Sequence, residues 1–279
     1  MEQVILILLT GLLAGTLGAI LGLGGGIIVT PILTVFMGID IRYAVGASVI
    51  AVIATSSGAT VAFLKDDVLN MRVAMFLEIF TTVGALLGAV LAGIFKPTVL
   101  YFLFGGLLLF QGWNMWRKLK GHQDDQVHDS LDPLATKLRL NGTYYDKESK
   151  RSISYTLEHV PGGAAVMFGA GLASGLLGIG SGAFKVMAMD GVMKMPLKPS
   201  SATSNLMMGV TGAASATVYF FSGYIQPLIA VPLALGILAG STFGSRIMQY
   251  LPARRLRQLF IPIVLVMAVQ LIYKGMAVF

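Results

Sequence analysis

Three ionisable residues lie inside long apolar stretches of this sequence: Glu78, Lys185 and Asp190. A charged group at the centre of a membrane helix costs at least about 2.5 kcal/mol on insertion scales, which makes such residues candidates for function. Lys185 follows Gly180-Ser181-Gly182 closely, so it falls in the first turn of a helix after a glycine-rich break. Free N–H groups and the positive helix dipole favour an anion there. We predict anion binding at Lys185; the alternatives are a pair with Asp190 or extension to the membrane surface.

Small polar side chains open the next apolar stretch and extend the candidate anion site. Residues 200–205 read Ser-Ser-Ala-Thr-Ser-Asn, and residues 46–48 (Gly-Ala-Ser) open a similar stretch in the first half of the chain. Buried polar groups need hydrogen bonds, so Thr203, Ser204 and Asn205 must bond to the bundle or to a ligand. Hydroxyl groups can bond to their own helix backbone, whereas an amide is harder to satisfy locally.

Residues suited to enzyme or metal chemistry are scarce in the apolar stretches. The chain has no cysteine, and its three histidines, His122, His128 and His159, lie between those stretches. An intramembrane enzyme needs a nucleophile, a metal site or an acid–base pair. We therefore expect no enzyme activity, no metal site and no cofactor.

The composition indicates the surroundings in which these residues act. Of the 279 residues, 56% are hydrophobic and 12% are charged, and the mean hydropathy is +0.80. A soluble domain carries about 25% charged residues, and a disordered chain has far less apolar content. The composition predicts an all-α polytopic membrane protein in a lipid bilayer. The net charge of +7 comes mostly from basic residues between the apolar stretches, where they set orientation, so no nucleic-acid partner is expected.

The second half of the sequence repeats the first: shifting the sequence by 156 positions, without a gap, aligns residue 22 with residue 178. Residues 22–26 (Gly-Leu-Gly-Gly-Gly) match residues 178–182 (Gly-Ile-Gly-Ser-Gly). Other matched pairs are Ser48 and Ser204, Thr55 and Thr211, Gly84 and Gly240, and Gly88 and Gly244. A register held over about 100 residues indicates an internal duplication.

Each copy contains five apolar elements, of which the second is short. The first copy has 4–23, 27–37, 45–64, 73–95 and 98–116, and the second has 162–179, 183–192, 200–221, 225–248 and 256–273. At about 1.5 Å per residue, the short elements span about half of a ~30 Å bilayer core. We predict half-helices after a glycine break, with tilted full spans as the alternative. The number of crossings per copy is odd in both cases, which predicts two inverted repeats.

Three regions follow from this pattern: transmembrane repeat 1 (1–116), a linker insert (117–160) and transmembrane repeat 2 (161–279). The loops on the side of the insert hold most of the basic residues: Lys65, Arg72, Lys194, Lys198, Arg254, Arg255 and Arg257. The opposite side holds only Arg42, Lys96 and Lys274. The bias predicts a multi-pass protein of the cell inner (plasma) membrane, with a cytoplasmic insert and both termini outside. The first stretch lacks a basic flank, so we expect it to belong to the fold and not to a cleaved leader.

The insert is expected to hold a small cytoplasmic β-element. Asn141-Gly142 between two short runs is typical of a type I′ hairpin turn. Residues 152–157 alternate between polar and apolar and predict a third strand.

Many of the 34 glycines recur at helical spacing and form small-residue faces: Gly11, Gly15, Gly18 and Gly22; Gly171, Gly175, Gly178 and Gly182; Gly84 and Gly88; Gly240 and Gly244. Such faces let helices approach closely in lipid, either within the chain or in a homodimer. The segments 22–26 and 178–182 are different, because so many glycines within five residues unwind a helix. No Gly-Lys-Ser/Thr sequence or preceding strand marks them as nucleotide-binding loops.

Glu78 has no counterpart in the second copy, where Ala234 occupies the matched position. One interpretation is that burial favours the protonated form of Glu78 and lets it carry a coupling proton. The alternatives are an ion pair with Arg42 or Arg72, or a position close to the membrane interface.

The two glycine motifs, each ending a first helix and each followed about 20 residues later by a small polar helix start, resemble the TauE/SafE family of sulfite and organosulfonate exporters. The likeness covers nearly the whole chain apart from the insert. It implies a transporter of small sulfur-containing or organic anions whose substrate lies between the two breaks. Thr30-Pro31 matches the proline that follows the break in the family, whereas Met187 stands at that place in the second copy. Ala47-Ser48 stands where the family often has Thr-Ser, as Thr203-Ser204 does here.

We therefore expect a secondary transporter that exports a small anion such as sulfite or an organosulfonate by alternating access. The expected substrate-binding residues are Gly24, Gly25, Gly26, Ser48, Gly180, Ser181, Gly182, Lys185, Thr203, Ser204 and Asn205, with Glu78 as the proton carrier. The alternative is a passive anion channel that uses the same site.

Overall fold

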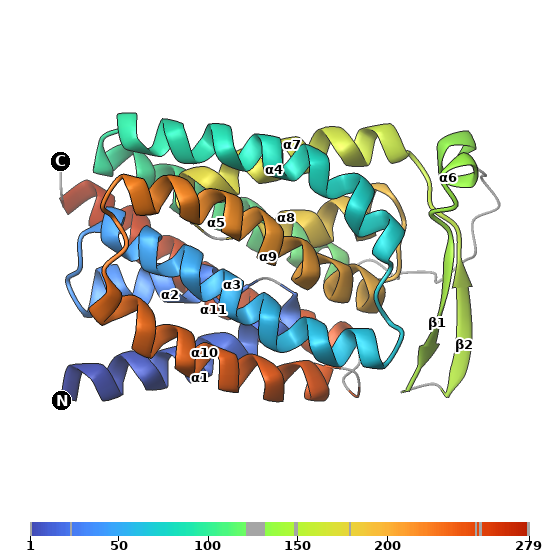
Figure 1. The fold of residues 1–279 in the computed structure, drawn as a ribbon, viewed down its shortest axis with the longest axis horizontal. Coiled ribbons are helices and arrows are strands. Elements are labelled where there is room, and N and C mark those ends of the chain that lie inside the picture. Colours follow the sequence, from blue (N-terminus) through green and yellow to red (C-terminus); the bar gives the residue numbers. More distant parts are fainter. Residues whose placement is uncertain are drawn as a thin grey trace.

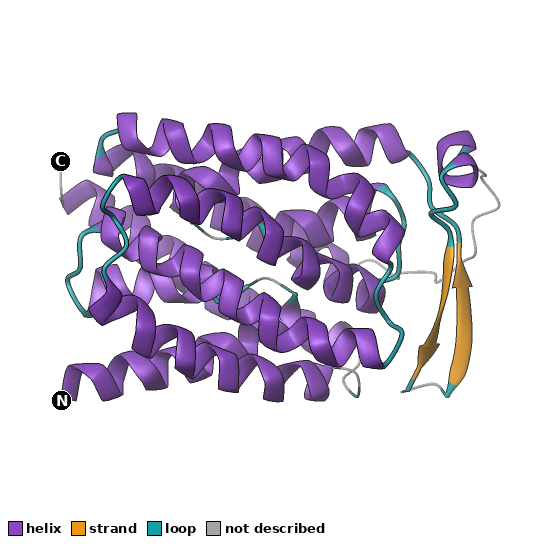
Figure 2. Ribbon diagram, in the orientation of Figure 1, coloured by secondary structure: helices purple, strands orange, loops and turns teal. Residues whose placement is uncertain are grey.

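The computed structural model describes residues 2–22, 24–120, 132–147, 150–178, 180–248, 250 and 253–277. These residues form a helical bundle with a small β-hairpin at one end (Figure 1, Figure 2). In the first half of the chain the helices are α1 (Glu2–Leu21), α2 (Gly26–Pro31), the π-helical η1 (Ile32–Phe36), α3 (Ile41–Lys65), α4 (Met71–Ile94) and α5 (Pro97–Lys120). In the second half they are α7 (Val160–Leu177), α8 (Gly182–Val186), the π-helical η2 (Met187–Val192), α9 (Leu197–Phe221), α10 (Pro227–Met248) and α11 (Ala253–Ala277).

Five of the described helices are long and apolar enough to cross a membrane: α1, α3, α4, α7 and α10. Large apolar side chains are exposed on their outer surfaces, among them Val61, Ile79 and Leu228. Exposed apolar area on this scale is typical of a membrane interface and not of a soluble monomer. The prediction of a helical membrane protein is confirmed.

The two predicted short elements are short helices that begin at the glycine breaks. The first runs over Gly26–Phe36, and the second consists of α8 followed by η2. Pro31 ends α2, and η1 begins at the next residue. Proline removes a backbone donor and favours such a local widening of the helix. Met187 begins η2 at the matched position, so the second π-helical segment forms without a proline.

The turns of the two halves follow the same backbone plan. Residues with positive φ recur at the 156-residue spacing: Gly22 (+67°) and Gly178 (+63°), Gly24 (+70°) and Gly180 (+71°), Gly38 (+69°) and Lys194 (+59°), Asp67 (+54°) and Gly223 (+74°). Left-handed backbone is unusual outside glycine, so Lys194 and Asp67 occupy positions that the turn itself dictates. The duplication seen in the sequence therefore extends to these turns of the breaks and of two loops, whereas the matched pair Gly25 (φ −58°) and Ser181 (φ +48°) differs.

The helices pair through the small-residue faces that the glycine spacing predicts. α1 lies along α10 at one edge of the bundle, and α4 lies along α7 at the opposite edge (Figure 1). A Cβ atom on Gly240 or Gly244 would overlap the backbone of α1, and one on Gly84 or Gly88 would overlap the backbone of α7. Packing through these faces within the chain is confirmed. α3 and α9 lie against each other in the interior of the bundle and carry the polar helix starts.

The insert forms a short helix and a two-stranded hairpin. α6 (Pro133–Lys137) precedes β1 (Gly142–Asp146), which pairs antiparallel with β2 (Arg151–Tyr155). The predicted turn at Asn141-Gly142 is wrong, because Gly142 is the first residue of β1 and pairs with Tyr155. The side chain of Asn141 instead accepts a hydrogen bond from the backbone N–H of Leu157. The strand predicted at residues 152–157 is present as β2, but it is the direct partner of β1 and not a third strand, since the described part of the insert has two strands.

The hairpin is attached to both halves of the helical bundle at the end remote from the two termini (Figure 1). Asn70, just before α4, donates from Nδ2 to the carbonyl of Leu140 at 2.8 Å and to the hydroxyl of Tyr155 at 2.9 Å. The ammonium nitrogen of Lys198, in the first turn of α9, lies 2.5 Å from Oδ1 of Asp146 in β1. Charge and hydrogen bonding thus fix the hairpin to the start of α4 and to the start of α9.

Candidate functional site

The two glycine breaks are joined by serine side chains that reach from one half of the chain to the other. Ser48 of α3 donates a hydrogen bond to the carbonyl of Gly178 at 2.6 Å. Its match, Ser204 of α9, bonds to the carbonyl of Gly22 at 3.0 Å and to that of Gly182 at 3.1 Å. Each serine therefore bonds to the break of the opposite half. The sequence predicted both serines, and the structure places both at the breaks.

Close approach at the breaks depends on the absence of side chains. A Cβ atom on Gly26 would lie 2.6 Å from the hydroxyl oxygen of Ser48 and 2.9 Å from the carbonyl oxygen of Gly178. Such distances are not tolerated, so position 26 requires glycine for this arrangement. The backbone N–H of Gly25 is bonded to the hydroxyl of Thr55 at 3.1 Å. The first break is thus held by α3 from its own half as well as by Ser204.

Lys185 is the centre of a buried polar network. Its side chain is fully buried, and Nζ lies 3.4 Å from Glu78 Oε2 and 2.5 Å from Thr211 Oγ1. Thr211 Oγ1 also lies 2.5 Å from Glu78 Oε1. Two further hydroxyls reach the carboxylate, with Thr81 Oγ1 at 2.9 Å from Oε2 and Thr82 Oγ1 at 3.0 Å from Oε1. One ammonium group, one carboxylate and three hydroxyls from α8, α4 and α9 form this network, which we call the Lys185 network.

The Lys185 network excludes both alternatives considered for Lys185. Lys185 has an exposed fraction of 0%, so extension to the membrane surface is wrong. Its ion-pair partner is Glu78 on α4, at a sequence separation of 107 residues, instead of the nearby Asp190. A buried ion pair is neutral as a whole, but removal of one partner leaves an uncompensated charge.

The arginines considered as partners of Glu78 bond elsewhere. Arg42 donates to the carbonyl of Phe95 at 3.4 Å, and Arg72 donates to the carbonyl of Arg139 at 3.1 Å. Glu78 is 8% exposed, so it does not lie at the surface of the protein. The interpretation of Glu78 as a partner of Arg42 or Arg72 is therefore wrong.

The remaining predicted residues divide into two groups. Thr203 accepts a hydrogen bond from the backbone N–H of Asn70 at 3.1 Å, so it holds the loop before α4. Asn205 donates from Nδ2 to the carbonyl of Ser201 at 3.0 Å, but its Oδ1 is buried without a partner. Ser181, between Gly180 and Gly182, has a buried hydroxyl without a partner and a φ of +48°. Buried polar atoms are normally satisfied, so these two atoms are available to a ligand.

Sequence reasoning missed the three threonines that surround Glu78. One signal was present, because Thr211 and Thr55 are matched in the repeat. Thr81 and Thr82 carry no such signal, because Ile237 and Leu238 stand at their matched positions. Among the residues that the structure describes, no group of three or more His, Cys, Asp or Glu side chains could hold a metal ion. His122 and His128 lie outside the described residues.

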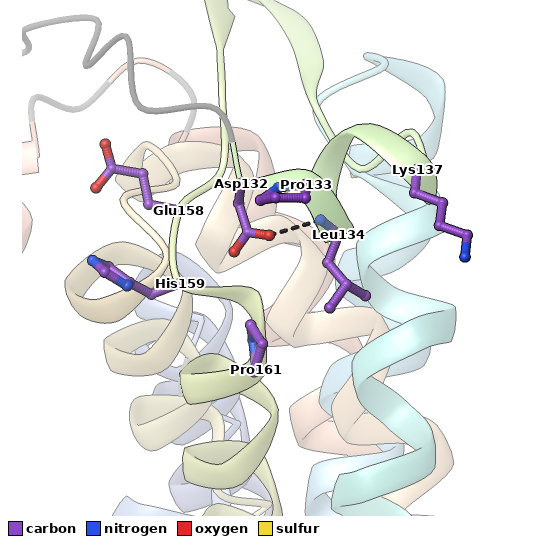
Figure 3. A pocket seen from close by; sticks show the side chains of 7 residues that line it. All are labelled: Asp132, Pro133, Leu134, Lys137, Glu158, His159 and Pro161. Atoms are coloured by element: carbon purple, nitrogen blue, oxygen red, sulfur yellow. Dashed lines mark hydrogen bonds between the residues drawn. The ribbon is translucent and has the colours of Figure 1, made fainter.

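Two surface pockets lie away from the breaks. One, of about 510 Å³, is formed between α6 and the start of α7 and is lined by Asp132, Lys137, Glu158 and His159 (Figure 3). Asp132 caps both helices there, accepting from the backbone N–H groups of Leu134 and Val160, each at 2.8 Å. The other pocket, of about 680 Å³, is an apolar groove between α3, α9 and α10.

The pKa of Asp132 is determined mainly by the backbone hydrogen bonds that its carboxylate accepts. Slight burial raises the pKa of Asp132, but hydrogen bonds from the backbone N–H groups of Val160, Leu134 and Ala135 outweigh it, with a smaller contribution from His159. The net pKa lies below the usual value, because these bonds favour the charged form. Asp132 therefore remains a carboxylate under ordinary conditions.

Known proteins that resemble this chain are described as membrane transporters. The family described as "Sulfite exporter TauE/SafE" matches residues 7–271. "Probable membrane transporter protein YunE" of Bacillus subtilis (strain 168) is 26% identical over 282 residues, 99% of either chain. "Probable membrane transporter protein MJ0441" of Methanocaldococcus jannaschii is 26% identical over 267 residues, which cover 90% of this chain and 89% of the relative. No solved structure matches this chain. With a match across nearly its whole length and a bundle of apolar helices, this multi-pass membrane protein belongs to the sulfite exporter TauE/SafE family.

Proposed function

We propose that this membrane transporter is a secondary exporter of a small anion, such as sulfite or an organosulfonate, with its binding site at the two glycine breaks. One observation carries the proposal: the fully buried Lys185 lies in the first turn after the second glycine break. Serine side chains from each half bond to the glycine break of the other half, so the two breaks lie together. Buried lysines in membrane segments are costly and are kept where they bind an ion. The family and the relatives support transport, and the site chemistry favours an anion.

The groups available to the anion come from both breaks. Lys185 supplies the positive charge, and the backbone N–H groups of Gly24, Gly26, Gly180, Ser181 and Gly182 are the proposed donors around it. The N–H group of Gly25 joins them only when it leaves the hydroxyl of Thr55. The unpartnered hydroxyl of Ser181 adds a donor. Asn205 would donate to the anion from Nδ2, which bonds to the carbonyl of Ser201 in this structure, because its unpartnered Oδ1 only accepts. Ser48 and Ser204 hold the breaks together, while Thr203 acts through Asn70.

The arrangement of the two halves supports alternating access as the proposed mechanism. We take residues 1–116 and 161–279 as inverted repeats, supported by the recurrence of left-handed turns at one spacing and by the crosswise serine bonds. Relative rocking of the repeats must break the bonds from Ser48 to Gly178 and from Ser204 to Gly22. An open channel would not need this cross-linking, which favours a transporter over the passive channel.

The proposed orientation places the insert in the cytoplasm and both termini outside, in the inner (plasma) membrane. The two termini lie at one end of the bundle and the hairpin lies at the other (Figure 1). Arg72 and Lys198 bond to the insert, so basic residues gather at the hairpin end. The excess of basic residues on the cytoplasmic side of membrane proteins supports this orientation.

Flux through purified protein tests the proposal. Proteoliposomes would be loaded with labelled sulfite, sulfoacetate or methanesulfonate, and wild type would be compared with Lys185→Met. We expect wild type to release at least one anion of the panel and Lys185→Met to match empty liposomes. Thr217→Val, on the outer face of α9, is the matched control and should transport as wild type does. Wild-type flux no faster than empty liposomes for every anion would refute the proposal, and single-channel currents would favour the channel.

A further inference from the structure

We infer that the Lys185 network couples the anion to a proton moving in the same direction, with Glu78 as the proton carrier. The inference rests on the proposed function, because it takes an anion at Lys185 as its starting point. It goes further by naming the coupled ion, its direction and the event that links the two ions.

The first step is the electrical state of the network without an anion. Lys185 Nζ and Glu78 Oε2 lie 3.4 Å apart, and both side chains are buried. The ammonium and the carboxylate compensate each other, so the site is neutral. An anion that approaches Lys185 competes with Glu78 for the same ammonium group. If both negative groups stayed charged, the buried site would carry an excess negative charge, which is strongly unfavourable.

Protonation of Glu78 removes this excess charge. The entering anion pairs with Lys185, and Glu78 takes one proton from water on the same side of the membrane, so the site remains neutral. On the other side the anion leaves Lys185, Glu78 releases the proton to water, and the ion pair forms again. One monovalent anion and one proton cross together, and no net charge is moved, so net export requires an outward anion gradient that exceeds the opposing proton gradient.

The surroundings of Glu78 suit both of its protonation states. Thr81, Thr82 and Thr211 place hydroxyl groups at its two oxygens, within 2.5 to 3.0 Å. A hydroxyl donates to a carboxylate, and after rotation it accepts from a carboxylic acid. A cage of backbone N–H groups could only donate and would resist protonation. Three hydroxyls therefore allow the proton to bind without leaving a buried group unsatisfied.

Few other titratable groups face Glu78 from the elements packed around it. α7 contributes none, and α9 contributes Lys198 and Tyr219. Lys198 bonds to Asp146 of the hairpin, and the hydroxyl of Tyr219 bonds to the carbonyl of Gly175. On the segment of α8 and η2, Lys185 is joined by Asp190, which is 8% exposed. Arg72 on α4 itself bonds to Arg139 of the insert, and Lys185 is the charged group that forms an ion pair with Glu78.

The duplication sets the stoichiometry at one proton for each anion. Val29 occupies the position matched to Lys185, and Ala234 occupies the position matched to Glu78. The first half therefore supplies the acid and lacks the cation, whereas the second half supplies the cation and lacks the acid. Lys185 and Glu78 are therefore a single pair of charged groups for both breaks, and each transport cycle carries one proton.

Simultaneous measurement of anion and proton movement tests the inference. Wild-type proteoliposomes with a trapped pH dye would receive an inward gradient of methanesulfonate or isethionate, strong-acid anions that do not themselves bind protons near neutral pH. We expect lumenal acidification with one proton for each anion, at a rate unchanged when valinomycin and potassium clamp the membrane potential. Glu78→Gln should lose the proton signal while still exchanging external for internal anion. Glu78→Asp keeps a titrating group and should retain the wild-type ratio at a lower rate.

The possible outcomes distinguish a failure of the inference from a failure of the proposed function. Asp66→Asn removes a carboxylate that pairs with Lys147 at the hairpin, and this control should keep the wild-type ratio. Wild-type anion flux without proton movement, or with protons moving in the opposite direction, would overturn the inference and leave the proposed function intact. A wild-type proton ratio in Glu78→Gln would also overturn it. If wild type carries no anion of the panel, both fail. The wild-type ratio is decisive even if Glu78→Gln does not fold.

Discussion

The two glycine breaks share left-handed turns at two matched glycine pairs, Gly22 with Gly178 and Gly24 with Gly180, but they differ in chemistry. At the first break, Thr55 bonds to the backbone N–H of Gly25, and Val29 fills the position that a lysine occupies in the second half. At the second break, the matched Thr211 bonds to Lys185 and Glu78. Here Ser181, the match of Gly25, adopts a left-handed φ and leaves its hydroxyl unpartnered. Duplication has thus preserved the architecture of both breaks while ion chemistry is confined to one.

The largest test of this difference is the removal of one charge from the Lys185 network. Lys185→Met removes the cation beside Glu78, which is expected to destabilise the protein by about 3–5 kcal/mol at a pH that keeps the carboxylate ionised. Lys185→Met combined with Glu78→Gln removes both charges and should recover most of that loss without restoring transport. Thermal unfolding in detergent measures the stability. A double variant as unstable as the single one would contradict an ion pair at this place.

The glycine faces should behave alike in the two halves, in contrast to the breaks. Gly88→Ala places a methyl group against the backbone of α7, and the matched Gly244→Ala places one against α1. Each substitution is expected to cost about 1–3 kcal/mol, because a packed interface must open to admit the methyl group. Gly106→Ala is the control, since no atom lies within 4 Å of its added Cβ. Clearly unequal losses at Gly88 and Gly244 would show that the two helix pairs do not pack equivalently.

The matched threonines sharpen the comparison between the breaks. Thr55→Val and Thr211→Val each remove one hydroxyl and keep the shape of the side chain, at an expected cost of about 0.5–1.5 kcal/mol. Only Thr211→Val should also alter transport and its dependence on pH, because only Thr211 bonds to the ion pair. Flux measured over a range of pH distinguishes the two variants. Equal effects of both on the pH profile would argue that the breaks share the chemistry.

The smallest effect is expected outside both halves, at the caps of α6 and α7. Asp132→Ala removes both cap bonds and should cost about 0.5–1 kcal/mol, near the low end for a helix cap. Because the pKa of Asp132 is lowered in the folded protein, its stabilisation is complete above the unfolded value of about 3.9 and is lost as the pH falls through the folded pKa. Hydrogen exchange of residues 133–137 measures this local effect. Protection that weakens at neutral pH in wild type would contradict it.

The repeat and the glycine spacing were sufficient to predict much of the fold and part of the site. The short helices, the paired glycine faces and the serines at the breaks follow from local spacing and from the duplication. The pairing of Lys185 with Glu78 could not be predicted, because it depends on the rotation of α4 and α8 about their axes. The turn at Asn141-Gly142 failed for a related reason. Local turn preference was outweighed by the contacts of Asn70 with Leu140 and Tyr155, which fix the hairpin in a different register.

The distance along the chain between the partners of the ion pair has a consequence for biosynthesis. α4 carries Glu78 into the membrane before α8, which carries Lys185, has been made, since the chain is synthesised from its N-terminus. Until then the acid has no cation beside it, and the first half is an incomplete folding unit. The second half made alone would carry an unmatched lysine. Although each half repeats the plan of the other, the chain can reach its final state only when both halves are present in the same membrane.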